Sequence, residues 1–207
     1  MAEEGSWSSI RRIGLLSTTA LLDLFEITGD ERNAIESQKR ARIFEITHPK
    51  HGRALVRDNK PLREQFLSQC LEGMTSRQWF ELLNRKVFFW VQRGRLEKLL
   101  TARAYRKRRH DVLTIDTRAL LERHLSSVTL CPINSGATLY PTATRRGPET
   151  FRSLADYDLP AMVKWRGAAD AIVELTVDYS VPNIESLTSR VERRFNGEPP
   201  VVLWEKP

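Results

Sequence analysis

A segment between residues 132 and 148 holds polar, aromatic and basic side chains that could do chemistry. It has neither helical nor strand periodicity, and long segments of this kind in compact domains are functional or disordered. Amide and hydroxyl groups can bind a ribose or a phosphate, an aromatic ring can stack on a base, and guanidinium groups can pair with a pyrophosphate. The side chains of these types are Asn134, Ser135, Thr138, Tyr140, Arg145 and Arg146. The alternative interpretation is a flexible surface loop.

A single carboxylate, Glu174, lies in the middle of the strongest strand pattern of the chain. In the stretch 170–184, Val173, Leu175 and Val177 occupy one side of a period-two alternation and Glu174 occupies the other. A carboxylate in an otherwise apolar strand costs desolvation free energy unless it faces solvent or a polar pocket. Glu174 is therefore either a solvated residue of a sheet face or part of a site.

Two segments of the chain resemble the DarT-type ADP-ribosyltransferases. Their catalytic strand has the form Ala-Glu-apolar-apolar-Val, followed by Val-Pro or Phe-Pro and then Ile, and here Pro182 follows Glu174 at the corresponding spacing. Residues 9–17, Ser-Ile-Arg-Arg-Ile-Gly-Leu-Leu-Ser, resemble their opening helix. The middle of the chain matches poorly. The whole chain also resembles a largely uncharacterised bacterial domain family that is distantly related to these enzymes.

The resemblance implies an α+β fold: an ADP-ribosyltransferase-like split β-sheet core with N-terminal and inserted helices. It implies NAD as a substrate, with no metal required, and an acceptor for ADP-ribose, for which a nucleic-acid base is favoured. Glu174 would bind a ribose hydroxyl and stabilise the oxocarbenium-like cation that forms when NAD loses nicotinamide. Arg40 would position the NAD, with Arg42 as the next nearest match, and Phe89 of the aromatic strand 85–91 would line the nucleotide cleft.

The resemblance also implies that the segment before the catalytic strand faces the acceptor. The side chains concerned are Tyr157, Lys164, Trp165 and Arg166. Simpler interpretations exist for the other residues. Cations such as Arg40 at the end of a helix complement its dipole, and an aromatic strand can be plain core.

One feature of the DarT-type enzymes is absent from this chain. They carry a His just before the first helix that contacts NAD, whereas this chain begins at Met1 and has no His there. Either upstream residues are missing or the site lacks that contact. The alternative function is therefore a non-enzymatic nucleic-acid-binding or interaction module, of toxin or phage-defence type, with the same fold and an inactive site.

The remaining elements are those that must hold these residues in place. Apolar spacing and capping residues predict helices at 6–13, 19–25, 28–42, 62–71, 76–83, 93–101 and 117–123. Alternation predicts strands at 43–47, 53–57, 85–91, 112–116, 128–131, 187–195 and 201–204. Without repeats or linkers, residues 1–207 are expected to form a single domain.

Composition narrows the class of protein. The chain has 207 residues, a net charge of +7, 41% hydrophobic and 29% charged residues, which is typical of a globular protein. The charge favours an anionic partner, nucleic acid or a phosphorylated ligand. No apolar run is long enough to span a membrane, and no signal-peptide pattern is present, so we expect a cytoplasmic protein. Cys70 and Cys131 form no zinc or disulfide pattern, and His48 and His51 lack further metal ligands.

Overall fold

The computed structural model describes residues 1–207 and has an α+β fold. The helices are α1 (Trp7–Ile13), α2 (Thr18–Leu24), α3 (Gly29–Glu36), α4 (Glu64–Cys70), α5 (Ser76–Asn84), α6 (Arg93–Thr101), α7 (Thr117–His124), α8 (Leu159–Arg166) and α9 (Ile184–Leu187). The strands are β1 (Ala2–Glu3), β2 (Leu15–Leu16), β3 (Phe44–His48), β4 (Gly52–Val56), β5 (Lys86–Trp90), β6 (His110–Ile115), β7 (Val128–Cys131), β8 (Arg152–Ser153), β9 (Glu174–Asp178), β10 (Ser180–Val181), β11 (Thr188–Arg194) and β12 (Val201–Glu205).

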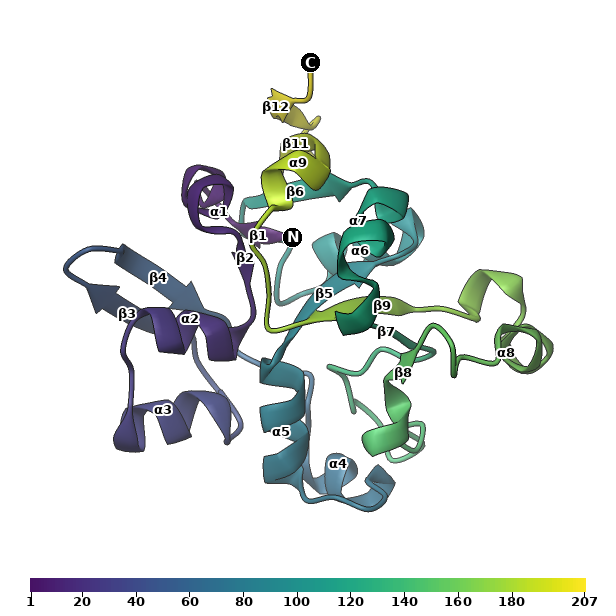
Figure 1. Ribbon diagram of the computed structural model, residues 1–207. Helices are drawn as coiled ribbons and strands as arrows, with labels where there is room; N and C mark the ends of the chain where they lie inside the picture. Colours follow the sequence, from purple (N-terminus) through teal and green to yellow (C-terminus); the bar gives the residue numbers. More distant parts are fainter.

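Two four-stranded antiparallel sheets form the centre of the molecule. Their strand orders are β1-β6-β11-β12 and β5-β9-β7-β8. The hairpin β3–β4 lies to one side with α2 and α3, while α4 and α5 lie below the second sheet and α8 projects on the opposite side (Figure 1). Strand β9 is central in its sheet, between β5 and β7.

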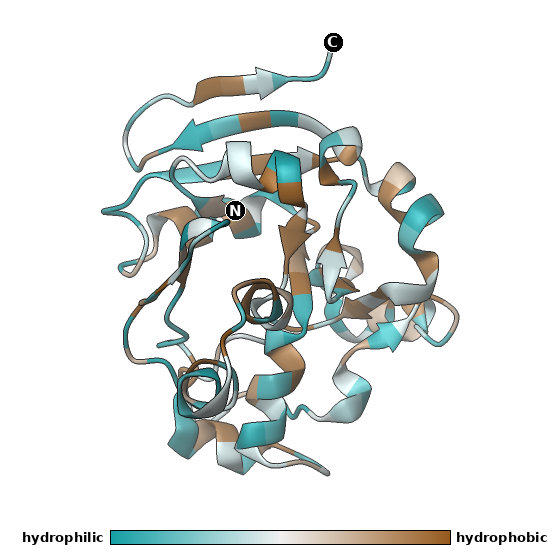
Figure 2. Ribbon diagram, turned by 60° about the vertical axis from the view of Figure 1, so that its left-hand side comes forward, coloured by the Kyte–Doolittle hydropathy of each residue, from teal (hydrophilic) through white to brown (hydrophobic).

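The main core lies on one face of the sheet that contains β9. Val87 of β5 and Leu175 and Val177 of β9 pack there with Leu120 of α7 and Leu187 of α9. Hydrophobic residues are accordingly concentrated on the central strands (Figure 2). Because the residues of a strand alternate between its two faces, the opposite face of β9 is left to Glu174 and its polar neighbours.

The two segments that carry the sequence resemblance lie against each other. Strand β2 pairs with β10, with Leu15 opposite Val181. Gly14, at φ 103°, lies so close to Pro182 that a Cβ atom there would be 2.6 Å from the proline Cα. The start of the chain is thereby attached to the turn that follows the Glu174 strand.

Several predicted boundaries need correction. The helix expected at 28–42 ends at Glu36, where the Asn84 amide caps the Glu36 carbonyl at 2.7 Å. Arg40 is therefore not at a helix C-terminus, and the dipole explanation for it is wrong. The strand expected from residue 170 begins at Glu174. Residues 159–166, for which no helix was expected, form α8, which Asp158 caps.

None of the helices combines the length and the apolar character that are needed to cross a membrane.

We predict that Gly14→Ala destabilises the protein by roughly 2–4 kcal/mol, because the new methyl group meets Pro182 at a positive φ. The matched control is Gly94→Ala in α6, where a Cβ meets nothing within 4 Å and alanine favours the helix. Urea denaturation of both variants measures the difference. Equal midpoints for the two variants would contradict the contact between β2 and β10.

Candidate functional site

Glu174 begins a polar row along β9. Cross-strand register places Cys131 of β7 and Trp90 of β5 on either side of it. Further along the same face, the Thr176 and Thr129 hydroxyls lie 2.6 Å apart. This face is covered by protein: Glu174 is 4% exposed, so the interpretation of a solvated sheet face is wrong.

The Glu174 carboxylate has few partners for a buried charge. Its Oε2 accepts a hydrogen bond of 3.2 Å from the Ser135 backbone amide. Burial raises the pKa of Glu174 to about 7, against the opposing effects of Ser135, Cys131 and the positive charge of Arg146. The carboxyl group therefore changes charge near neutral pH, as suits a group that exchanges protons.

The Ser135 hydroxyl beside it is fully buried and lacks a partner. It lies near enough to lower the pKa of Glu174, but it makes no hydrogen bond of acceptable geometry. An unsatisfied buried hydroxyl costs about 1–3 kcal/mol. Its place next to a buried carboxylate, in the wall of a cavity, suits a ligand that supplies hydroxyl groups of its own.

The segment 132–148 is held against the protein by its own polar side chains. Arg146 is buried and donates to the carbonyls of Ser135 and Ala137 at 3.0 and 3.1 Å. Thr138 accepts from the Arg63 amide at 2.9 Å and contacts the Arg63 carbonyl at 3.1 Å. These contacts fix the segment to the protein, and its residues 134–137 form part of the wall of the site.

A cavity of about 690 Å³ brings part of the predicted site together. Its walls include Glu174, Asn134 and Ser135 from the β9 side, Phe89 of β5, and Arg40 from the N-terminal part of the chain. It also extends along residues of β6 and β11, so both central sheets contribute to its lining. A volume of this size is typical of small-ligand sites.

Arg40 enters this cavity with a charge that no carboxylate pairs. Its guanidinium donates to the carbonyls of Arg57 (2.8 Å) and Ile35 and to Asn84 Oδ1 (3.1 Å). Burial lowers its pKa to about 10, so it stays charged at neutral pH. A buried cation without an ion pair, at the wall of a cavity, favours an anionic ligand.

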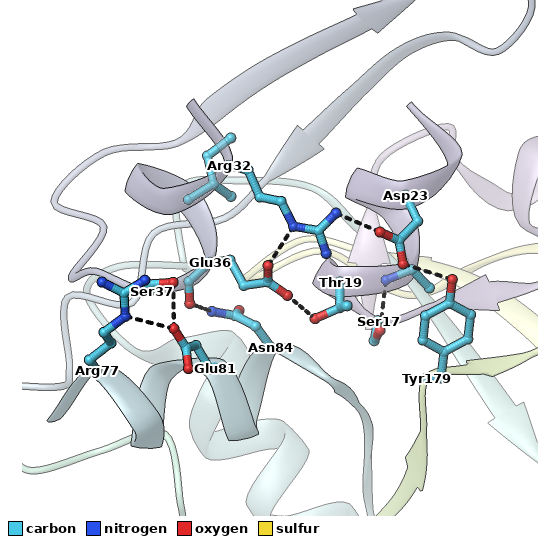
Figure 3. Close-up of polar contacts among 12 residues, drawn as sticks. Ser17, Thr19, Asp23, Arg32, Glu36, Ser37, Arg77, Glu81, Asn84 and Tyr179 are labelled. Carbon is cyan, nitrogen blue, oxygen red and sulfur yellow. Dashed lines mark hydrogen bonds and ion pairs between the residues drawn. The ribbon is translucent and has the colours of Figure 1, made fainter. Parts of the chain in front are cut away.

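A chain of polar contacts runs from Tyr179, the residue after β9, through α2 and α3 to Asn84 of α5 (Figure 3). The Tyr179 hydroxyl donates to Asp23 at 2.8 Å, and Arg32 bridges Asp23 and Glu36 at 2.5 and 2.7 Å. The Asn84 amide then joins the Glu36 carbonyl to Arg40. The strand that carries Glu174 and the side chain of Arg40 are therefore joined by one network of hydrogen bonds.

The structure places the other predicted residues elsewhere. Arg145 is exposed and pairs with Glu72, and with Tyr157 and Trp165 it lines a separate cavity of about 430 Å³. Tyr157 is itself buried, and its hydroxyl donates to the Ala171 carbonyl. Residues that line neither cavity are Arg42, which lies over the Phe44 ring, Thr138, the 69% exposed Tyr140, and Lys164 and Arg166 of α8.

The polar residues of the main cavity that sequence reasoning missed include three consecutive ones, Arg57, Asp58 and Asn59. They follow directly after β4, at the point where the chain leaves the hairpin. Asn59 accepts from the Arg40 amide at 2.7 Å, so this segment also supports Arg40. A run of three polar residues directly after an alternating strand is the signal that could have found them. No cluster of His, Cys, Asp or Glu in the structure could hold a metal ion.

Comparison with known proteins gives one match. The model of a family described as "Family of unknown function (DUF7002)" matches residues 1–188, so that all of β11 after its first residue, and β12, lie outside the match. Neither the curated proteins nor the solved structures contain a match.

We predict that Glu174→Gln stabilises the protein at pH 8. A raised pKa means that the folded chain holds the Glu174 proton more tightly than the unfolded chain does, whose ordinary pKa is 4.5. Wild-type stability should therefore fall as the pH rises from about 4.5 to 7, by roughly 3 kcal/mol in total. The stability of the glutamine variant should lack this pH dependence, because glutamine does not ionise.

Thermal denaturation of both proteins between pH 4.5 and 8 measures the effect. The control is Glu185→Gln, which removes an exposed carboxylate that pairs with Arg11. A Glu174→Gln protein whose stability relative to wild type is the same at both ends of this range would contradict a buried, proton-exchanging Glu174.

Proposed function

We propose that this chain, which belongs to the family of unknown function DUF7002, is an NAD-dependent ADP-ribosyltransferase. In this proposal it cleaves NAD between nicotinamide and ribose and transfers ADP-ribose to an acceptor, with a nucleic-acid base as the favoured acceptor. The two central sheets, which line one cleft, would correspond to the split core of that enzyme class.

The observation that carries the proposal is the environment of Glu174. A carboxylate that is 4% exposed lies beside an unpartnered, buried hydroxyl in the wall of a cavity large enough for a nucleotide. A purely structural carboxylate would be expected to have a full set of hydrogen-bond partners. The Glu174 carboxylate and the Ser135 hydroxyl can instead be satisfied by the hydroxyl groups of a ribose.

The reaction needs few reactive groups. The bond between ribose C1′ and the nicotinamide nitrogen breaks, and its electron pair leaves with neutral nicotinamide. The ribose is left with an oxocarbenium-like cation, which the Glu174 carboxylate stabilises through a ribose hydroxyl. An acceptor nitrogen or oxygen then bonds to C1′ and loses a proton, for which Glu174, with a pKa of about 7, is a suitable base.

Arg40 is suited to bind the phosphates of NAD, the second function that the reaction needs from the protein. Its charge has no carboxylate partner, and it lines the same cavity as Glu174. It can hold the phosphates of NAD while the ribose lies against Glu174. The guanidinium donates to Asn84 and to two backbone carbonyls, and the Asn59 side chain accepts from the Arg40 amide. These contacts give Arg40 a fixed position, which is what pre-organised catalysis requires.

The acceptor surface is proposed to lie around α8 and the smaller cavity. Trp165 is 58% exposed, and the Arg166 guanidinium lies over its ring at 5.0 Å. Exposed Lys164 adds positive charge next to this ring in α8, while the charge of Arg145 at the smaller cavity is paired with Glu72. An exposed aromatic ring among cations is suited to stacking on a base next to a phosphate chain.

One observation favours the alternative of a binding module without catalysis. Between α6 and β6 the chain carries Arg103, Arg106 and Lys107, all exposed and without ion pairs. A basic segment of this kind can contact phosphates whether or not the protein has a catalytic site. The two functions differ in their need for Glu174: the transferase requires its carboxylate for catalysis, and the binding module does not.

We predict that the purified protein releases nicotinamide from NAD and that Glu174→Gln lowers the rate at least 100-fold, as loss of a catalytic carboxylate does. Chromatography of nicotinamide, with and without single-stranded DNA, measures the rate. Glu185→Gln is the surface control and should retain full activity. Equal rates for wild type and Glu174→Gln would leave the binding module as the better account.

We further predict that the rate of nicotinamide release rises with pH and levels off above about pH 7, because Glu174 must be ionised to stabilise the cation. The slope below that pH should approach tenfold per pH unit. A rate that is constant between pH 5.5 and 8 would show that no such ionisation controls the step.

A further inference from the structure

A second cavity, of about 630 Å³, continues the one that contains Glu174. Its walls come from α1, β2 and α2 on one side and from the hairpin β3–β4 on the other. The two cavities share the side chains of Arg40, Arg57 and Phe89. The cleft therefore has two arms, which meet at a pair of arginines.

Arg57 presents unused hydrogen-bond donors at this junction. Its contacts all involve Nη2: the Ala2 carbonyl at 3.2 Å, Glu3 Oε2 at 3.3 Å and His110 Nδ1 at 2.9 Å. The Nε and Nη1 atoms have no hydrogen-bond partner in the protein, and the side chain remains about a quarter exposed. The Tyr105 ring lies 5.9 Å from the guanidinium carbon and restricts its movement.

His110 fixes the orientation of Arg57. Because Arg57 donates to Nδ1, the imidazole is neutral and carries its proton on Nε2, which lies 3.2 Å from the Tyr105 carbonyl. Burial and the charge of Arg57 both lower the pKa of His110, which maintains this state. Arg57 is thus held by its Nη2 end while its other donors stay free.

Both arginines line the junction of the two arms, and they have a single ion-pair partner between them. Arg40 Nε donates to the Arg57 carbonyl at 2.8 Å, and Arg40 Nη2 has no partner. Glu3 is the only carboxylate in an ion pair with either of them, and Asp58, which also lines the junction, opposes through its charge the lowering of the Arg40 pKa by burial. Two cations with free donors at one point of a cleft repel each other unless an anion lies between them.

We infer that Arg40 and Arg57 together bind the diphosphate of a dinucleotide at the junction of the two arms. The nucleoside to be cleaved would lie in the arm that ends at Glu174, and the other nucleoside in the arm between α1, α2 and the hairpin. This rests on the proposed function for the identity of the dinucleotide. Diphosphate recognition itself follows from two forked cations with unused donors at one junction, each able to contact one phosphate bidentately.

Titration calorimetry with ADP-ribose, ADP and inorganic pyrophosphate tests the inference. Arg57→Gln should weaken binding of all three roughly 10- to 100-fold, as loss of a charged hydrogen-bond donor does. Arg57→Lys should recover only part of the affinity, because a lysine cannot form the fork. Arg118→Gln, which removes an exposed positive charge of α7, is the control for net charge and should bind as wild type does.

Glu3→Gln distinguishes ligand binding from a structural role of Arg57. It removes the carboxylate that pairs with Arg57 and should leave diphosphate affinity unchanged or increased. If Arg57 acted only by holding β1 in place, Glu3→Gln would weaken binding as Arg57→Gln does, and the inference would be overturned. Melting temperatures of all variants show whether they are folded.

The outcomes separate this inference from the proposed function. Arg57-dependent binding of ADP without nicotinamide release would retain the diphosphate site and contradict the transferase. Nicotinamide release together with wild-type ADP affinity in Arg57→Gln would retain the transferase and contradict the diphosphate site. Failure of the wild-type protein to bind any of the three ligands at millimolar concentration would also contradict the diphosphate site.

Discussion

The burial of β9 on both of its faces is the constraint on which the rest of the structure depends. One face supplies Leu175 and Val177 to the core. The other places Glu174 and Thr176 against protein and ends at the exposed Asp178. The second and third of these polar groups have side-chain partners, Thr129 and Lys86. Glu174 has one backbone amide and an unsatisfied hydroxyl beside it, so the polar row is least satisfied where it reaches the cleft.

The N-terminal part of the chain forms the opposite side of that cleft, and it is fixed to the strand it faces. Pairing of β2 with β10, the close approach of Gly14 to Pro182, and the contact of Tyr179 with Asp23 all join the first helices to the residues just after β9. These contacts place Arg40 at the cavity that Glu174 also lines. A site assembled from segments so distant in sequence needs such attachments to have a defined geometry.

The local structure was predictable because its signals are local. Alternation placed Glu174 on the polar side of its strand, and the Thr75 cap and apolar spacing located α5. What could not be predicted depends on tertiary contacts. The end of α3 at Glu36 is set by Asn84, which is far along the chain. Arg146 was expected to face a ligand, but its guanidinium instead binds backbone carbonyls that a loop of this length must satisfy.

The most direct test of this account is the ionisation of Glu174 itself. Carbon-13 NMR of the glutamate carboxyl groups, with Glu174→Gln to assign the resonance, measures its pKa in the folded protein. The account predicts a midpoint near 7, with a shift of the resonance when a ligand with ribose hydroxyls is added. A midpoint close to the ordinary value of 4.5 would show that Glu174 is solvated, and would contradict the site described around it.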